Sequence, residues 1–227
     1  MKYVIEPPAA AAVPVEGGGL FPVHRIYCVG RNYAAHALEM GGDPNREEPF
    51  FFQKNADSIV IQGGDFPYPA KSRDVHHEIE LVVALSRGGE NIPLPDAQTC
   101  VFGYAAGLDM TRRDLQGECK KHGRPWEIGK AFEHSAPIGD IVPASRSGHP
   151  KAGAIWLKVD GKMRQEGNLN QLIWKVPEII SYLSGFFTLK PGDLIMTGTP
   201  SGVAAVERGN VLEGHVDGVG DVRTKII

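Results

Sequence analysis

The chain has 227 residues, enough for one large domain with a substantial core, and its 24 basic and 27 acidic side chains give a net charge of −3 at pH 7. No segment concentrates Lys or Arg, which argues against nucleic acid or an anionic membrane as a main partner. No run approaches the roughly 20 apolar residues that span a bilayer, and Cys28, Cys100 and Cys119 lack the spacing of a disulfide framework or a zinc site, so we expect a cytoplasmic protein.

The chain opens with residues 1–22, which are predicted to form an extended N-terminal appendage ending in three glycines. Its Ala9–Val13 stretch lies between prolines and is too short for a signal-peptide core, so we expect a loose surface segment. Residues 23–227 are expected to form a single domain.

The rest of the chain is made of short apolar runs between turn signals. A strand at residues 25–29 is followed by a helix from about Tyr33 to Met40, with Asn32 as candidate N-cap and Gly41-Gly42 as its stop. Further strands are predicted at residues 50–53, 78–85, 101–108, 154–159, 193–196, 210–215 and 222–226, and helices at 112–122 and 176–186.

Two local signals refine this pattern. Asp160-Gly161 is typical of a two-residue hairpin turn, and Thr111 with Asp114 has the spacing of a capping box at the start of the 112–122 helix. Many short strands, few helices, no internal repeat and no βαβ rhythm predict an α+β, mainly β fold.

Glu78 and Glu80 stand at the start of the apolar run from Leu81 to Leu85. Because side chains alternate along a strand, both carboxylates project to one face, about 7 Å apart. Burying two carboxylates together is costly, and a hard divalent cation such as Mg²⁺ or Mn²⁺ removes that cost. The alternative is a solvent-facing pair on an edge strand.

Asp109 ends the predicted strand at residues 101–108 and is a candidate third carboxylate ligand; alternatively it is a turn or capping residue. Arg113 and Gln116 lie three residues apart on the next helix and share a face near its N-terminus, which favours an anionic substrate. The alternative for this pair is a solvated helix face.

Three more segments carry candidate chemistry. Lys130 lies in an apolar neighbourhood and is a candidate for stabilising an enolate or a carboxylate, and the loop with Thr199 suits carboxylate binding. His36 and Glu39 lie three residues apart on the short helix, where such a pair is a competent general base. A surface lysine, an ordinary turn and an exposed helix face are the respective alternatives.

Together these segments resemble the fumarylacetoacetate hydrolase family, over about residues 25–226. The motifs are Cys28-Val29-Gly30-Arg31-Asn32-Tyr33 with His36 and Glu39, Phe51 to Lys54, His76-His77-Glu78-Ile79-Glu80, Gly103-Tyr104 through Leu108-Asp109 to Gln116, Gly129-Lys130-Ala131-Phe132, Arg164 to Asn168, and Thr197 to Val203. Within the family, the chain most resembles the small acylpyruvases, and among these the bacterial fumarylpyruvate hydrolases of gentisate breakdown. The segment Asp43 to Pro49 also resembles that branch.

The resemblance implies a β-rich roll or distorted barrel, a homodimer, and Mg²⁺ or Mn²⁺ held by Glu78, Glu80 and Asp109. It implies that Lys130, Arg31, Arg113, Gln116 and Thr199 surround a β-diketo acid substrate, with His36 and Glu39 on a lid helix.

The expected reaction is hydrolysis of a C–C bond in fumarylpyruvate, with His36, oriented by Glu39, activating water while the metal and Lys130 carry enolate charge. The same enolate chemistry decarboxylates oxaloacetate, so a 2-oxo acid decarboxylase is the competing interpretation. A non-catalytic protein that kept the fold would be expected to lose a carboxylate or the lysine, and this chain retains all four.

Overall fold

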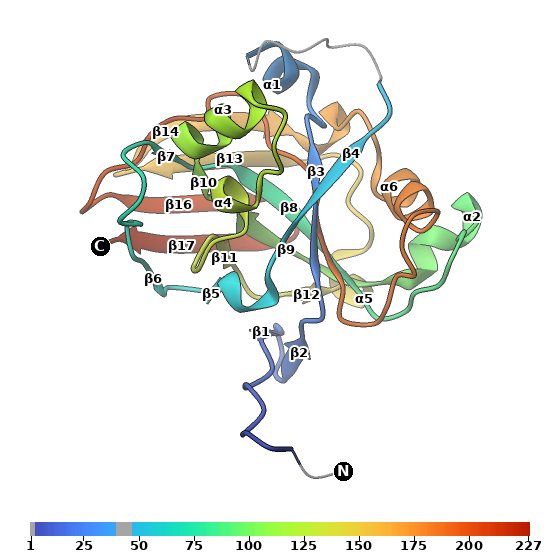
Figure 1. Ribbon diagram of the computed structural model, residues 1–227. Coiled ribbons are helices and arrows are strands. Elements are labelled where there is room, and N and C mark those ends of the chain that lie inside the picture. Colours follow the sequence, from blue (N-terminus) through green and yellow to red (C-terminus); the bar gives the residue numbers. More distant parts are fainter. Residues whose placement is uncertain (1–2, 40–46) are drawn as a thin grey trace.

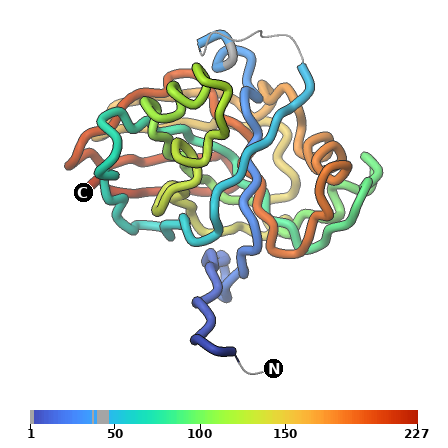
Figure 2. The backbone as a smooth tube through the Cα atoms, in the orientation of Figure 1, coloured from blue at the N-terminus to red at the C-terminus, as the bar shows by residue number. Residues whose placement is uncertain are grey.

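The structure, a computed structural model, describes residues 3–39 and 47–227 and consists of two main β-sheets with short helices around them (Figures 1 and 2). In spatial order, the larger sheet contains β4 (Phe50–Lys54), β3 (Ile26–Gly30), β15 (Leu194–Met196), β8 (Ile79–Leu85), β9 (Val101–Leu108), β11 (Ala136–Ile138) and β5 (Ile59–Ile61), with β12 (Val142–Pro143) also paired to β9. The smaller sheet contains β14 (Lys162–Asn168), β13 (Ala154–Val159), β16 (Val211–Val216), β17 (Gly220–Ile226) and β6 (Asp65–Phe66).

Two small ribbons, six α-helices and three 3-10 helices complete the described elements; the 3-10 helices are η1 (Ala56–Ser58), η2 (Gln98–Cys100) and η3 (Leu169–Gln171). The ribbons pair β1 (Ala12–Pro14) with β2 (Leu20–Pro22) and β7 (Val75–His76) with β10 (Thr111–Arg112). The helices are α1 (Ala34–Glu39), α2 (Leu94–Ala97), α3 (Arg113–Lys121), α4 (Glu127–Lys130), α5 (Ala144–Ser147) and α6 (Val176–Leu183). The predicted α+β, mainly β fold is confirmed.

Strand β8 is buried on both faces, which explains its uninterrupted apolar sequence. Leu81 and Val83 lie in the core between the two sheets, whereas Val82 and Ala84 lie in a second core on the opposite face of the larger sheet. Glu80 is in phase with Val82, so its carboxylate projects toward that second face near the start of the strand.

The N-terminal segment is more ordered than the sequence predicted. Part of the stretch expected to be loose forms β1, and Val13 in β1 and Phe21 in β2 are buried in the second core. The Pro-rich context concealed this strand. It pairs with β2 in a ribbon separate from the two main sheets, seen beneath the larger sheet in Figure 1. The division into an appendage and one domain stays a prediction.

The Asp160-Gly161 turn is confirmed, since it joins β13 to β14 and both residues have positive φ. Two capping predictions were wrong. The N-cap of α3 is Arg112 without a side-chain bond, while Thr111 donates to the Asp109 carbonyl and Asp114 bonds to Ser72 and Arg73.

Asn32 does not cap α1 with its side chain, contrary to the prediction. Its side-chain amide donates to the carbonyls of Trp174 and Thr197, and its oxygen accepts from the Trp174 N–H. It therefore joins the start of α1 to the segment after β15. Met40 and the expected Gly41-Gly42 stop lie outside the described residues.

No helix in the described parts of the chain is long and apolar enough to cross a membrane.

Candidate active site

Three carboxylates meet where β8 begins and β9 ends. The two strands are antiparallel with Ile79 opposite Leu108, so Glu78 and Asp109 face each other, and the Asp109 N–H donates to the Glu78 carbonyl at 2.8 Å. Carboxylate oxygens of Glu78, Glu80 and Asp109 lie within 4.8 Å of one another, and all three residues are buried. Strand register therefore builds the acidic cluster that the sequence predicted.

Two buried lysines neutralise part of this charge. Lys130, at the end of α4, donates to Glu78 at 2.8 Å, to Asp109 at 2.7 Å and to the Thr111 hydroxyl at 2.6 Å. Lys54, at the end of β4, lies 2.9 Å from the other Asp109 oxygen and donates to the carbonyls of Met110 and Lys130. Asp109 is therefore held between two ammonium groups.

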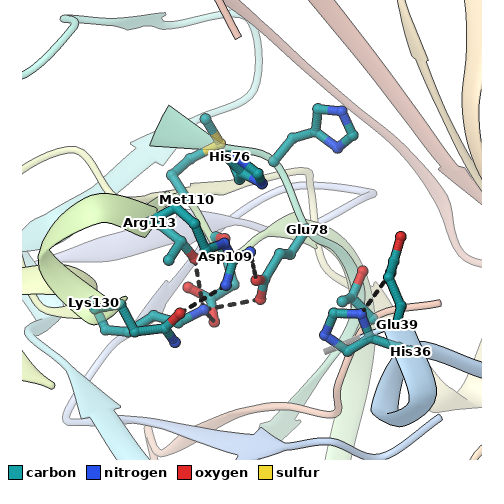
Figure 3. A network of polar contacts seen from close by, with 12 residues as sticks. His36, Glu39, His76, Glu78, Asp109, Met110, Arg113 and Lys130 are labelled. Atoms are coloured by element: carbon teal, nitrogen blue, oxygen red, sulfur yellow. Dashed lines mark hydrogen bonds and ion pairs between the residues drawn. The ribbon is translucent and has the colours of Figure 1, made fainter. Parts of the chain in front are cut away.

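Arg113 approaches the cluster from the first turn of α3. Its guanidinium donates to the Glu78 carboxylate and, at 2.7 Å, to the side-chain oxygen of Gln116, as three-residue spacing on a helix allows. Figure 3 shows Lys130 and Arg113 on one side of Glu78, with His36 and Glu39 on the other.

The charges leave Glu80 as the least compensated carboxylate. Burial alone would raise the pKa of Glu78, but Lys130 and Arg113 lower it below its ordinary value. For Glu80, burial, Asp109 and Glu78 all raise the pKa well above its ordinary value, and the Gly198 N–H at 2.6 Å only partly offsets this. A set of three carboxylate oxygens with excess negative charge at Glu80 fits a hard cation such as Mg²⁺ or Mn²⁺.

A loop of residues 197–200, after β15, closes the side of the cluster next to Glu80. Gly198 adopts a φ of +100°, which points its N–H at Glu80. The buried Gln165 of β14 fixes the next turn by donating to the Thr199 hydroxyl and the Pro200 carbonyl, both at 2.8 Å. The side-chain oxygen of Gln165 lies 2.9 Å from His77 Nδ1 and accepts a hydrogen bond from the Ile79 N–H.

Helix α1 places His36 on the side of Glu78 opposite Lys130 and Arg113 (Figure 3). His36 is 6% exposed, and its Nδ1 lies 3.1 Å from a Glu39 carboxylate oxygen. Glu39 also accepts from the Gly202 N–H at 3.0 and 3.2 Å, which ties α1 to the chain beyond the 197–200 loop. The Glu39 carboxylate therefore orients the imidazole and leaves its other nitrogen toward the pocket.

One pocket is lined by most of the predicted site residues. They are Arg31, His36, Glu78, Glu80, Asp109, Arg113, Gln116, Lys130 and Thr199. Glu39 is joined to this group through His36. The roles assigned to these residues stay predictions, but the structure brings all of them into one place.

Residues 25–227 match the family described as "Fumarylacetoacetate (FAA) hydrolase C-terminal". The chain belongs to the fumarylacetoacetate hydrolase family. Rat oxaloacetate tautomerase FAHD1 is 46% identical over 88% of this chain and 90% of its own length, and Dictyostelium discoideum oxaloacetate decarboxylase is 42% identical over 86% and 89%.

A solved family structure extends the likeness to the N-terminal segment. Fumarylpyruvate hydrolase from Pseudomonas aeruginosa, in complex with Mn²⁺ and pyruvate, is 53% identical, with a TM-score of 0.98 over 100% of this chain and 99% of that one. The segment Asp43 to Pro49, which also pointed to this branch, lies mostly outside the described residues.

Within this family site, sequence reasoning missed two buried residues. Lys54 carried one available signal, since alternation along β4 puts it on the same face as Phe50 and Phe52. Gln165 lies in the family motif Arg164 to Asn168, but the sequence did not indicate its role, because its partners His77 and Thr199 are remote in sequence. The three cysteines are free and buried, and burial together with Asp109 raises the pKa of Cys28, so a thiolate nucleophile is not supported.

Proposed function

We propose that this protein is a divalent-metal-dependent hydrolase that cleaves the C–C bond of an acylpyruvate, with fumarylpyruvate as substrate and fumarate and pyruvate as products. The observation that carries the proposal is the oriented His36–Glu39 pair facing the same pocket as the three carboxylates and Lys130. A water-activating base is required for hydrolysis and is superfluous for enolate chemistry alone.

Glu78, Glu80 and Asp109 would hold Mg²⁺ or Mn²⁺, which when bound supplies Lewis-acid stabilisation of charge on substrate oxygens. Gln116 and Arg113 would orient the keto-acid end of the substrate, since Arg113 offers a planar, charged donor set at the N-terminus of α3. The Thr199 hydroxyl, positioned by Gln165, would bind an adjacent carboxylate or carbonyl oxygen.

His36 would then take a proton from a water molecule as that water attacks the distal carbonyl carbon. The bond between this carbon and the methylene carbon breaks, and its electron pair leaves with the pyruvate half as an enolate. Lys130 would stabilise the enolate electrostatically, because a buried ammonium acts strongly in a low-dielectric site. Proton return to the methylene carbon completes pyruvate, and the acyl half leaves as a carboxylic acid.

The test is loss of the ultraviolet absorbance of fumarylpyruvate and acetylpyruvate, with and without Mg²⁺ or a chelator, alongside pyruvate release. We expect metal-dependent bleaching with equimolar pyruvate, and a loss of roughly 10²–10⁴-fold in turnover for His36→Ala. His122→Ala is the matched control, because that histidine directly follows α3 and its side chain is 45% exposed. Turnover by His36→Ala equal to that of the unmodified protein would refute the role of His36.

A second candidate is favoured by the relatives named oxaloacetate tautomerase and oxaloacetate decarboxylase. Both names fit an enzyme that stabilises an enolate through the same carboxylates and lysine without attacking water. Carbon dioxide release from oxaloacetate, or its enol–keto conversion, that survives His36→Ala while both acylpyruvates stay intact would assign the protein to this candidate.

The homodimer and the part in gentisate breakdown, which the resemblance implies, and the cytoplasmic location expected from the sequence stay predictions. Light scattering of the purified protein tests the first directly.

A further inference from the structure

The charged face of α3 extends beyond the residues assigned so far. Lys120 follows Gln116 by four positions and Arg113 by seven, so the three side chains share one helix face, and all three line the pocket. Lys121, the next residue, is exposed and lies off this face. The pocket therefore contains a cation, Lys120, with no part in the chemistry proposed above.

Arg31, after β3, lines the same pocket. Neither Arg31 nor Lys120 forms an ion pair with a carboxylate in the parts of the chain that the structure describes. Burial, followed by Arg113 and Arg31, lowers the pKa of Lys120 to about 8, and Glu78 offsets these effects only in part.

The backbone at Arg31 adds an independent sign of function. Arg31 has a φ of +56°, a conformation that costs a non-glycine residue roughly 1–2 kcal/mol. Such strain gathers at functional sites, where the side chain itself is needed.

Aromatic rings connect these cations to the metal site. Lys120 Nζ lies 5.0 Å from the Trp126 ring, Arg31 lies 5.9 Å from the Phe50 ring, and Lys130 Nζ lies 5.0 Å from the Phe52 ring. Trp126 in turn contacts Phe50 and Phe52, with ring centroids 5.3 and 5.7 Å apart. A wall of edge-on and tilted aromatic rings therefore runs from the buried lysine to the two outer cations.

We propose that Lys120 and Arg31 form a subsite for the terminal carboxylate of an unsaturated, dicarboxylic acyl group, whose flat chain lies along the wall of Phe50, Phe52 and Trp126. The inference rests on the proposed function and names the substrate class that the site selects. It makes Lys120 a specificity-determining residue, distinct from the groups that act on the C–C bond.

The dimensions agree with this assignment. Seven residues of helix rise about 10 Å between Arg113 and Lys120. Fumarylpyruvate extends roughly 7–8 Å between its terminal carbons, if six bonds span twice the 3.8 Å of three backbone bonds. A substrate held at its keto-acid end by Arg113 and Gln116 thus presents its far carboxylate within reach of the flexible Lys120 side chain.

The experiment compares fumarylpyruvate with acetylpyruvate, which lacks the second carboxylate, in Lys120→Met, Arg31→Asn and the control Lys121→Met. Methionine keeps the apolar stem that packs on Trp126, and asparagine tolerates positive φ, so both variants should fold. We expect the ratio of kcat/KM for fumarylpyruvate over acetylpyruvate to fall about 10-fold in each variant, mainly through KM, and to be unchanged in Lys121→Met. An unchanged ratio in Lys120→Met would overturn the proposal.

A binding measurement separates this proposal from the proposed function. Calorimetric titration of the Mg²⁺-loaded protein with fumarate and with crotonate, in which a methyl group replaces one carboxylate, requires no turnover. Tighter binding of fumarate by the unmodified protein, with the preference lost in Lys120→Met, supports the subsite even if no acylpyruvate is cleaved. Equal binding of the two acids by the unmodified protein would overturn the subsite even if fumarylpyruvate is hydrolysed.

Discussion

Glu80→Gln provides a sharp test of the metal site. Of the three carboxylates in the cluster, Glu80 is the one that has no ion pair with a lysine or arginine among the described residues. Burial, Asp109 and Glu78 raise its pKa, so the metal-free folded protein retains a proton there that the unfolded chain releases above about pH 4.5. The stability of the metal-free protein should therefore fall as pH rises from about 4.5 through the folded-state pKa. Glutamine removes this pH dependence and still accepts a hydrogen bond from the Gly198 N–H.

The size of the metal effect follows from mass action. A cation at about 100 times its Kd stabilises the folded protein by about 2.7 kcal/mol, which in a chain of this length raises Tm by roughly 5–10 °C. If loss of one of three anionic ligands weakens binding about 100-fold, the same concentration contributes only about 0.4 kcal/mol, or roughly 1–2 °C.

Differential scanning fluorimetry at pH 8, with chelator and then with Mg²⁺, measures both effects. We expect the metal-free Glu80→Gln variant to melt above the metal-free unmodified protein and to gain little from Mg²⁺. Glu166→Gln, an exposed position on β14, should behave as the unmodified protein. A full Mg²⁺ response in Glu80→Gln would refute the assignment of the metal site, and a metal-free Tm below that of the unmodified protein would refute the charge argument.

Three further perturbations test the surrounding structure. Gly198→Ala should lower the free energy of unfolding by about 1–3 kcal/mol and weaken Mg²⁺ affinity. The reason is that Gly198 has a φ of +100° and the new Cβ would lie 2.7 Å from Asn32 Cβ. Urea unfolding measures the first effect and metal titration the second. His77 is buried, and burial lowers its pKa to about 4. As pH falls from about 6.5 to 4, the free energy of unfolding should therefore drop by up to about 3 kcal/mol. His77→Asn should remove this pH dependence, as measured by urea unfolding over the same pH range. Lys54→Met should cost about 3–5 kcal/mol in chemical unfolding, because Asp109 loses one of its two buried cations, while Lys71→Met at an exposed position should cost little; a loss below about 1 kcal/mol would contradict the pairing.

The sequence predicted those parts of the fold and site that depend on local pattern. Alternation and apolar run length located β8 and β9 and so placed Glu78 and Asp109 at strand ends. The structure then shows that the two strands are paired. Three-residue spacing correctly placed His36 with Glu39 and Arg113 with Gln116, because helix geometry determines such pairs without reference to the rest of the chain.

The missed features depend on contacts between distant segments. Asn32 and Thr111 have the side chains of capping residues, but tertiary partners at Trp174 and Lys130 use the same polar atoms. In sequence, Lys54 at the end of an aromatic strand resembles an ordinary exposed lysine, since only the folded structure shows its ion pair with Asp109. The burial of Val13 likewise requires the second face of the larger sheet, which no local pattern reveals.

The structural origin of each site residue suggests how one family accommodates the different reactions named for its members. Glu78, Glu80 and Asp109 lie on or beside central strands, and two buried lysines support them, so this centre cannot shift without disturbing the core. The group proposed to distinguish hydrolysis from tautomerisation or decarboxylation lies elsewhere: it is His36, on the six-residue α1. Lys120, proposed to select the substrate, lies in the last turn of α3. The reaction and the substrate therefore depend on groups outside the buried centre, which is why replacing His36 should change the reaction and replacing Lys120 the substrate, while metal binding stays intact.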